Sequence, residues 1–200
     1  MKENRGKFLI QKTLVVIKPD SVKRGIIGEI ISRFERAGLK IVAMKMVWLD
    51  RKKAEEFYYA DDNWLVSVGN KTLTRYKEMG LDPKEEFGTD DPKIIGKTIR
   101  EWLINFITSG PVVAIVLEGV NAVEVVRKIV GPTEPLRAPP GTIRGDFAHV
   151  SIAYANWNKM VLRNVVHASE TEKDALREIF IFFNLEEIYN YDRNIEEIIY

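Results

Sequence analysis

His167 is the residue of this sequence whose position most favours chemistry. It lies in the segment NVVHASE, directly before a predicted helix start. Ser169 and Glu172 have the spacing of a capping box, and apolar side chains follow at helical spacing. A neutral imidazole is a nucleophile near pH 7, and a helix N-terminus offers backbone amides to an anion. The segment therefore favours phosphoryl transfer through His167, although a lone histidine can also serve packing alone.

Four polar side chains on predicted loops and helix ends could meet the charge of a phosphate. Lys18 follows the first predicted strand, and Arg127 lies in the last turns of a predicted helix. Thr133 and Arg144 lie in the loops beyond that helix. Phosphoryl transfer needs converging cations, because the charge on the transferred group must be balanced in the transition state. Each residue also has a purely structural explanation, which for Arg144 is an ion pair with Asp146.

Helical periodicity gives Glu178 no clear role. The apolar stripe from Leu176 to Phe183 predicts that Glu178 lies on the opposite, solvent-facing side of its helix. Glu178 gains a role if the histidine loop folds over that side, where a carboxylate could orient the imidazole. Ser169 also has two explanations: an N-cap alone, or an N-cap whose hydroxyl touches the histidine and the carboxylate.

The elements that must position these residues follow from hydrophobic patterns. Strands are predicted at residues 13–17, 39–49, 111–117 and 145–152, and helices near 27–34, 50–59 and 121–130. With the short helix at 50–59 set aside, the order is βαββαβ, which predicts an α+β fold with a ferredoxin-like antiparallel sheet and helices on one face. The other face needs cover from extra segments or from another subunit.

Two stretches are predicted to be insertions in a single domain that spans residues 1–200. Residues 63–107 hold a Gly- and Asp-rich segment between helix-like pieces, and we expect a lid or a packing elaboration. Residues 150–160 precede the histidine segment and are expected to form a longer loop. A C-terminal extension follows the last predicted helix. No internal repeat argues for a second domain.

The composition excludes several classes of protein. The chain has 200 residues, of which 46% are hydrophobic, and no cysteine, which excludes disulfides and thiolate chemistry. Its 30 Lys and Arg against 29 Asp and Glu create no global field for nucleic acid or a membrane. No GxxxxGK loop, HRD triplet or HExxH motif occurs. The polar N-terminus lacks an apolar signal segment and the apolar runs are too short to span a bilayer, so we expect a cytoplasmic protein.

Four segments, in this order, resemble the nucleoside diphosphate kinase family. They are KTLVVIKPDSVKRGIIGEIISRFERAGLKIVAMK, SGPVVAIVLEG, PGTIRGDF and NVVHASE, and the similarity covers nearly the whole chain from Lys12 onward. The resemblance implies a ferredoxin-like core and an enzyme that moves the γ-phosphate from nucleoside triphosphates to nucleoside diphosphates. It also implies a ping-pong route through phosphorylated His167.

The resemblance assigns site residues by matching position. His167 is the phosphorylated histidine, with Glu178 and Ser169 as its support, and Lys18 and Tyr58 complete the catalytic set. The nucleotide-binding positions outside the base clamp are Lys18, Arg127, Thr133, Arg144 and Asn164. The implied cofactor is Mg2+, which is held through the nucleotide phosphates and not by protein side chains.

The base-binding positions depart from the family pattern. The family clamps the base between a phenylalanine and an aliphatic residue in a helical hairpin, which the insertion at 63–107 interrupts. Leu103 aligns as the aliphatic residue. Trp64 is our choice for the aromatic residue, with Ile99 and Trp102 as alternatives, and a core position is the other explanation for Trp64.

The resemblance also implies a homo-oligomer, commonly a hexamer built from dimers, that covers the free sheet face. The alternative from a different class is a non-catalytic, oligomeric nucleotide-binding or scaffold relative. Intact His167, Arg144, Lys18 and Glu178 argue against that alternative. A ferredoxin-like sheet can also bind RNA, but the RNP aromatics and the basic face that this function needs are lacking.

Overall fold

Residues 9–193 are described from a computed structural model, and residues 1–8 of the polar N-terminus lie outside this range. The elements are, in chain order, β1 (Ile10–Ile17), α1 (Pro19–Lys23), α2 (Ile27–Arg36), β2 (Lys40–Val47), α3 (Arg51–Phe57), α4 (Asp62–Glu78), α5 (Pro83–Phe87), α6 (Pro92–Ile107), β3 (Val112–Val120), α7 (Ala122–Val130), η2 (Pro135–Arg137), α8 (Ile143–Phe147), α9 (Ile152–Trp157), β4 (Val166–Ala168), α10 (Glu172–Phe182) and η3 (Leu185–Glu187). None of the helices in residues 9–193 is long and apolar enough to cross a membrane.

Four antiparallel strands form one sheet in the order β2-β3-β1-β4. Strands β1 and β3 pair with Val15 opposite Ile115, and the short β4 pairs with β1 so that His167 lies opposite Val16. This is the ferredoxin-like βαββαβ order, so the predicted fold class is confirmed. The apolar runs of β1 and β3 are almost uninterrupted because both faces of these central strands are buried.

The position predicted for the fourth strand is wrong. Residues Ile143–Phe147 form α8, and the side chain of its N-cap residue Thr142 accepts a hydrogen bond from the backbone N–H of Gly145. This local cap favours a helical turn over an extended strand. Strand β4 is instead Val166–Ala168, which is too short to show an alternating pattern. His167 therefore lies within the sheet.

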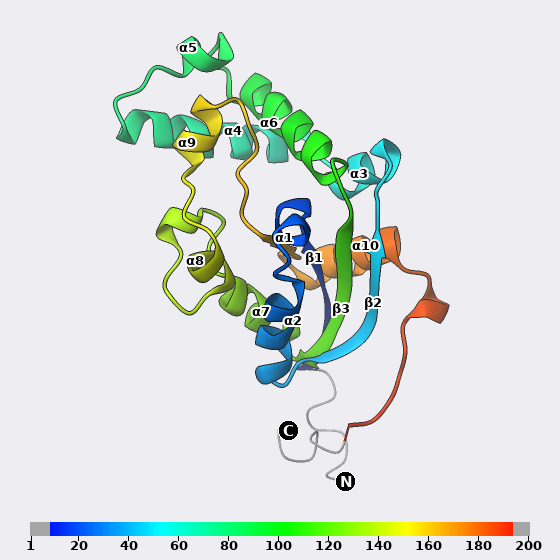
Figure 1. The fold of residues 1–200 in the computed structure, drawn as a ribbon. Coiled ribbons are helices and arrows are strands. Elements are labelled where there is room, and N and C mark those ends of the chain that lie inside the picture. Colours follow the sequence, from blue (N-terminus) through cyan, green and yellow to red (C-terminus); the bar gives the residue numbers. More distant parts are fainter. Residues whose placement is uncertain (1–8, 194–200) are drawn as a thin grey trace.

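Segments of this chain cover both faces of the sheet (Figure 1). On one face, α2 and α7 contribute core residues such as Ile30 and Val126. On the other face, α10, α3 and the end of α6 contribute Ile179, Phe57 and Ile104. The sequence left open whether extra segments or another subunit cover the second face of the sheet. In the structure, extra segments of the same chain supply much of this cover.

Helix α10 turns a different side to the core than its apolar stripe predicts. Its N-cap is Thr171, so the capping box predicted for Ser169 is wrong. Leu176 and Phe180 are 58% and 53% exposed, whereas Glu178 is buried. Prediction from hydrophobic periodicity assumes that carboxylates face solvent. A carboxylate is nevertheless stable in the interior when hydrogen bonds satisfy it.

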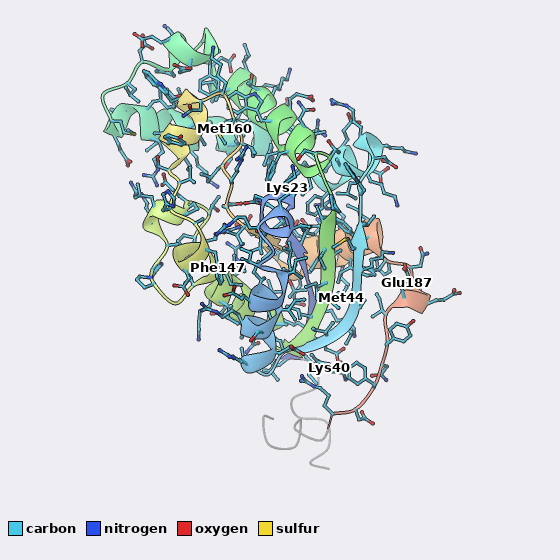
Figure 2. All side chains as sticks on the ribbon, viewed as in Figure 1. Lys23, Lys40, Met44, Phe147, Met160 and Glu187 are labelled. Atoms are coloured by element: carbon cyan, nitrogen blue, oxygen red, sulfur yellow. The ribbon has the colours of Figure 1, made fainter. Side chains whose placement is uncertain are left out.

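The C-terminal extension runs along the free edge of β2 (Figure 1). The backbone N–H of Tyr189 donates to the carbonyl of Val42 at 2.8 Å. Lys45 on β2 pairs with Glu187, labelled on η3 in Figure 2, at 2.6 Å. An open strand edge is a template for pairing with other chains, and this extension blocks part of it.

Helices α4 and α6 form a close hairpin joined through α5 (Figure 1). Two glycines permit the contact between these helices. A Cβ on Gly69 would lie 1.9 Å from the carbonyl oxygen of Pro92, and a Cβ on Gly96 would lie 2.1 Å from that of Leu65. The hairpin is therefore locked backbone against backbone.

The stretch expected to form a loop at residues 150–160 contains α9, so that prediction is wrong. Ser151 caps this helix by accepting a hydrogen bond from the N–H of Tyr154 at 3.1 Å. The carboxylate of Glu134 accepts a second one from the N–H of Ile152 at 2.9 Å. A helix of six residues is too short for its periodicity to stand out in the sequence. It contacts α4, so two segments distant in sequence lie together (Figure 1).

We expect Gly96→Ala to lower the free energy of unfolding by about 1–3 kcal/mol, because the new methyl group collides with the backbone of α4. In an open helix the same change stabilises by about 1 kcal/mol. The control is Gly28→Ala in α2, where nothing lies within 4 Å of the added Cβ. Urea denaturation of both variants tests the sign of each effect, and a stabilised Gly96→Ala protein would contradict the close helix contact.

Candidate active site

A cavity of about 1410 Å³ collects most of the residues singled out from the sequence. It lies among β4, the α4–α6 hairpin, α9 and the loop after α7. The predicted site residues that line it are Lys18, Tyr58, Trp64, Leu103, Arg127, Thr133, Arg144, Asn164, His167 and Glu178. Ser169 is fully buried and lies outside this lining.

His167 is held by a carboxylate and by an aromatic ring. Its Nε2 lies 2.7 Å from Oε2 of Glu178, and its ring meets Phe57 edge to face with the centroids 4.7 Å apart. Ser169 Oγ donates to the same carboxylate oxygen at 2.7 Å. Among residues 9–193, nothing forms a hydrogen bond with Nδ1 of His167.

The electrostatics of Glu178 decide which imidazole nitrogen carries the proton. Burial alone would raise the pKa of Glu178, but the charge and hydrogen bonds of His167 and Ser169, with Arg177 nearby, hold that pKa below its ordinary value. An ionised carboxylate can only accept hydrogen bonds, so in the neutral form of the imidazole Nε2 is the nitrogen that carries the proton. Nδ1 keeps its lone pair and is the nitrogen available to a ligand in the cavity.

The backbone that leads into β4 is strained. Val165 has a φ of 73°, a conformation that β-branched residues rarely adopt. Its carbonyl accepts hydrogen bonds from the backbone N–H of Lys18 at 3.0 Å and from Ser21 Oγ at 2.8 Å. These two bonds hold the strained turn in place and so set the direction in which His167 leaves it.

Arg144 also holds this turn. It is buried, and its guanidinium donates to the carbonyls of Gly131, Asn164 and Val166 at 2.9, 3.2 and 2.8 Å. The ion pair with Asp146 that the sequence left open does not form, because Asp146 pairs with an arginine on α2. The remaining N–H groups of the guanidinium are left for a ligand.

Lys18, Asn164 and Thr133 form a chain of hydrogen bonds. Lys18 Nζ donates to Asn164 Oδ1 at 2.6 Å, and Asn164 Nδ2 donates to the carbonyl of Thr133 at 2.9 Å. Burial and the charge of Arg144 lower the pKa of Lys18 to about 7. Burial and the charge of Arg127 lower the pKa of Arg144 to about 10. The cations repel one another, and an anionic ligand would relieve that repulsion.

Tyr58 supplies a neutral donor. Its hydroxyl is buried and has no hydrogen-bond partner in the described part of the chain. Burial and the nearby charge of Glu178 raise the pKa of this phenol, so it stays protonated at neutral pH. Arg127 lies farther out, with 45% of its side chain exposed and Glu170 at 3.7 Å.

Aromatic and apolar side chains of α4 and α6 form part of the cavity lining. The lining includes Trp64 on α4 and Ile99, Trp102 and Leu103 on α6. The ring of Trp102 packs against Phe87 with the centroids 5.8 Å apart, whereas within residues 9–193 Trp64 has no ring contact. This difference favours Trp64 over Trp102 as a stacking surface.

The described residues contain no group of three or more His, Asp or Glu placed to hold a metal ion. A divalent cation in this cavity would need oxygen ligands from a bound phosphate ligand.

Ser21 and Phe57 position His167, although the sequence analysis did not single them out. Ser21 follows the KPD letters directly, and this adjacency was the available signal. Phe57 is the last residue of α3 and shows no local pattern that separates it from an ordinary core aromatic. Both contacts join segments more than a hundred residues apart.

A ferredoxin-like sheet that carries a carboxylate-oriented histidine beside converging cations has the make-up of a histidine phosphotransferase. Comparison with known proteins identifies the family. The family model for nucleoside diphosphate kinase matches residues 11–64 and 92–188, and the chain belongs to this family of phosphotransferases. The nucleoside diphosphate kinase of Pyrobaculum aerophilum is 51% identical over 179 residues, which cover 90% of this chain and 98% of that protein. That of Borreliella burgdorferi is 44% identical over 189 residues, covering 94% and 96%.

Solved structures agree with this assignment. The crystal structure of the NDP kinase from Pyrobaculum aerophilum has a TM-score of 0.88 at 50% identity and covers 90% of this chain and 100% of that one. The transition-state mimic of the Borrelia burgdorferi enzyme with vanadate and ADP has a TM-score of 0.76 at 42% identity, covering 94% and 96%. The predicted family and enzyme class are therefore confirmed. The family model leaves residues 65–91 unmatched, which lie inside the stretch predicted to be an insertion.

We expect Lys18 to make the free energy of unfolding rise with pH. Below a pH of about 7 this lysine is charged in both states, and the cost of burying its charge falls on the folded protein. Between its folded pKa of about 7 and its ordinary value of 10.5, the folded protein binds fewer protons than the unfolded chain, so stability increases through this window.

Urea denaturation of the wild type and of Lys18→Met at several pH values across this window isolates the contribution of the lysine from other titrating groups. The variant should be the more stable protein near neutral pH, and its advantage should shrink as the pH rises. Stability curves that stay parallel would show that the lysine does not titrate as described.

Proposed function

We propose that this protein transfers the γ-phosphoryl group of a nucleoside triphosphate to a nucleoside diphosphate through phosphorylated His167. The observation that carries the proposal is the hydrogen bond between Nε2 of His167 and Glu178 at 2.7 Å. It leaves the Nδ1 lone pair as the nucleophile in a cavity that also holds Lys18, Arg127 and Arg144.

In the first half-reaction, Nδ1 of His167 attacks the γ-phosphorus in line with the leaving oxygen. The N–P bond forms while the bond between the γ-phosphorus and the bridging oxygen breaks, and the nucleoside diphosphate leaves with that oxygen. Positive charge develops on the imidazole during the attack, and the Glu178 carboxylate balances it. Ser169 holds the carboxylate in place.

The cations and donors of the cavity stabilise the charge on the phosphates. Arg144 offers the N–H groups that its carbonyl partners leave free, and Arg127 reaches in from the rim. Lys18, buried and with a low pKa, gains a proton when phosphate charge arrives beside it. Tyr58 and Thr133 supply hydroxyl groups near the phosphates, and Asn164 and Lys18 hold the ribose end and the leaving oxygen in register.

In the second half-reaction, another nucleoside diphosphate enters the same cavity and takes the phosphoryl group from His167. The same residues serve both halves because donor product and acceptor are chemically alike. Mg2+ bound to the nucleotide phosphates would supply further charge neutralisation. Stacking of the base between Trp64 and Leu103 ignores base identity, so we infer a broad range of nucleotides.

We also propose a cytoplasmic homo-oligomer, with a hexamer as the preferred state. Strand β2 and the residue that follows it carry exposed apolar side chains that a second copy could cover, since Met44, Met46 and Trp48 are 52%, 57% and 65% exposed. Met44 is labelled on this strand in Figure 2.

One domain with insertions near residues 63–107 and 150–160 remains our proposal for the organisation of the chain.

We expect His167→Ala to abolish the phosphorylated intermediate. Wild-type protein incubated with γ-labelled ATP should form an acid-labile, alkali-stable adduct that disappears when a nucleoside diphosphate is added. The control is His149→Ala, because His149 is exposed and does not line the cavity. Label retained by His167→Ala, or lost by His149→Ala, would place the nucleophile elsewhere.

We expect Glu178→Gln to slow phosphorylation of His167 by about 10- to 100-fold, the scale for losing the partner that orients a histidine. The neutral amide no longer balances the charge that develops on the imidazole. Rapid-quench measurement of the labelled intermediate gives this rate. The matched control is Glu172→Gln, an exposed residue of the same helix, and a rate as low as that of Glu178→Gln would assign the effect to helix α10 as a whole.

A further inference from the structure

We propose that Asn156 of α9 binds the base of the nucleotide by donating a hydrogen bond from its side-chain amide to an acceptor that every base offers, N3 of a purine or O2 of a pyrimidine. This inference rests on the proposed function, since it takes a nucleoside di- or triphosphate as the ligand of the cavity. It adds a polar base contact to a site whose other base contacts are stacking surfaces.

The amide of Asn156 is buried and unsatisfied. The residue is 5% exposed and lines the cavity, yet its Nδ2 has no hydrogen-bond partner among residues 9–193. A buried donor without a partner destabilises a folded protein, and most such groups in proteins are paired. An acceptor on a ligand in the cavity would satisfy it.

The other unsatisfied groups of the cavity already have explanations. Within the described residues, Tyr58, Glu134 and Asn156 are the cavity-lining residues with a buried polar side-chain atom that lacks a hydrogen bond. The free oxygen of Glu134 lies 3.1 Å from Arg75 and 3.3 Å from Arg137, so ion pairs compensate it. The Tyr58 hydroxyl belongs to the phosphate end of the proposed site. Asn156 is left without a role.

Helix α9 lies between the loop after α7 and helix α4, which both line the cavity. Its first residue, Ile152, donates its N–H to Glu134, which directly follows Thr133. The helix also packs against α4, whose residue Trp64 lines the same cavity, and Met160 just beyond α9 is labelled in the same region of Figure 2. Ile152 and Asn156 are four residues apart, so both lie on the face of α9 that lines the cavity.

The parts of the chain that flank Asn156 and line the cavity are apolar, which suits a base better than a phosphate. The cavity-lining residues nearest to Asn156 in the chain are the apolar Ile152, Met160, Val161 and Leu162. An uncharged amide beside apolar side chains is the kind of group that reads the hydrogen-bonding edge of a base. The cavity of about 1410 Å³ exceeds the roughly 300–1,000 Å³ of ordinary ligand pockets, so a base and the groups around it fit within it.

The test compares ligands with and without a base. Asn156→Leu removes the amide and keeps much of its volume. By titration calorimetry, we expect the Kd of this variant for ADP to rise about 3- to 10-fold, the effect of one hydrogen bond, while its Kd for ribose 5-diphosphate stays unchanged. The Tm of the ligand-free variant should equal or exceed that of the wild type, because an unpaired donor has been removed.

The matched control is Asn158→Leu. This asparagine ends the same helix, donates to the carbonyl of Tyr154 at 2.8 Å and does not line the cavity, so its loss should leave both Kd values unchanged. Equal weakening of ADP and ribose 5-diphosphate by Asn156→Leu, or no weakening of either, would overturn the inference. Calorimetric binding needs no phosphoryl transfer, so a wild-type protein that binds ADP without transferring phosphate would contradict the proposed function alone.

Discussion

The hydrogen bond between His167 and the buried carboxylate of Glu178 is the interaction on which the rest of this site depends. It selects the tautomer of the imidazole and leaves a single nitrogen for the ligand. Its geometry requires helix α10 to turn Glu178 inward, and the exposed side chains of Leu176 and Phe180 are the consequence. The core of this helix is thus arranged around a charge, and Ser169 and Arg177 keep that charge stable in the interior.

The second requirement is a fixed approach of the chain into β4. Val165 adopts a backbone conformation that its side chain disfavours, and the strain persists because surrounding groups hold its neighbours. Lys18 takes part through its backbone, which binds the turn, and through its ammonium group, which binds Asn164. Arg144 likewise combines structural bonds to carbonyls with a position in the cavity. Residues that we propose to meet the phosphates therefore also build the frame that directs the histidine.

Much of the fold could be predicted from the sequence because its long elements have strong patterns. The apolar runs of β1 and β3 and the stripe of α2 are examples. The short elements β4, α8 and α9, of three to six residues each, could not be predicted in this way. Local caps decide α8 and α9, and pairing with β1 decides β4. Residue types and predicted elements made His167 and the cations candidates, and the family motifs assigned their roles. Contacts such as those of Ser21 with Val165 and of Phe57 with His167 join distant segments, and no local pattern encodes them.

The glycine contacts between α4 and α6 have a consequence for how a ligand is received. Because Gly69 and Gly96 bring the two backbones together, this wall of the cavity is built before any ligand arrives. A preformed wall loses little conformational entropy when a ligand binds, so more of the free energy of the contacts remains as affinity. The enlarged hairpin thus gives the enzyme a preorganised wall for its ligand.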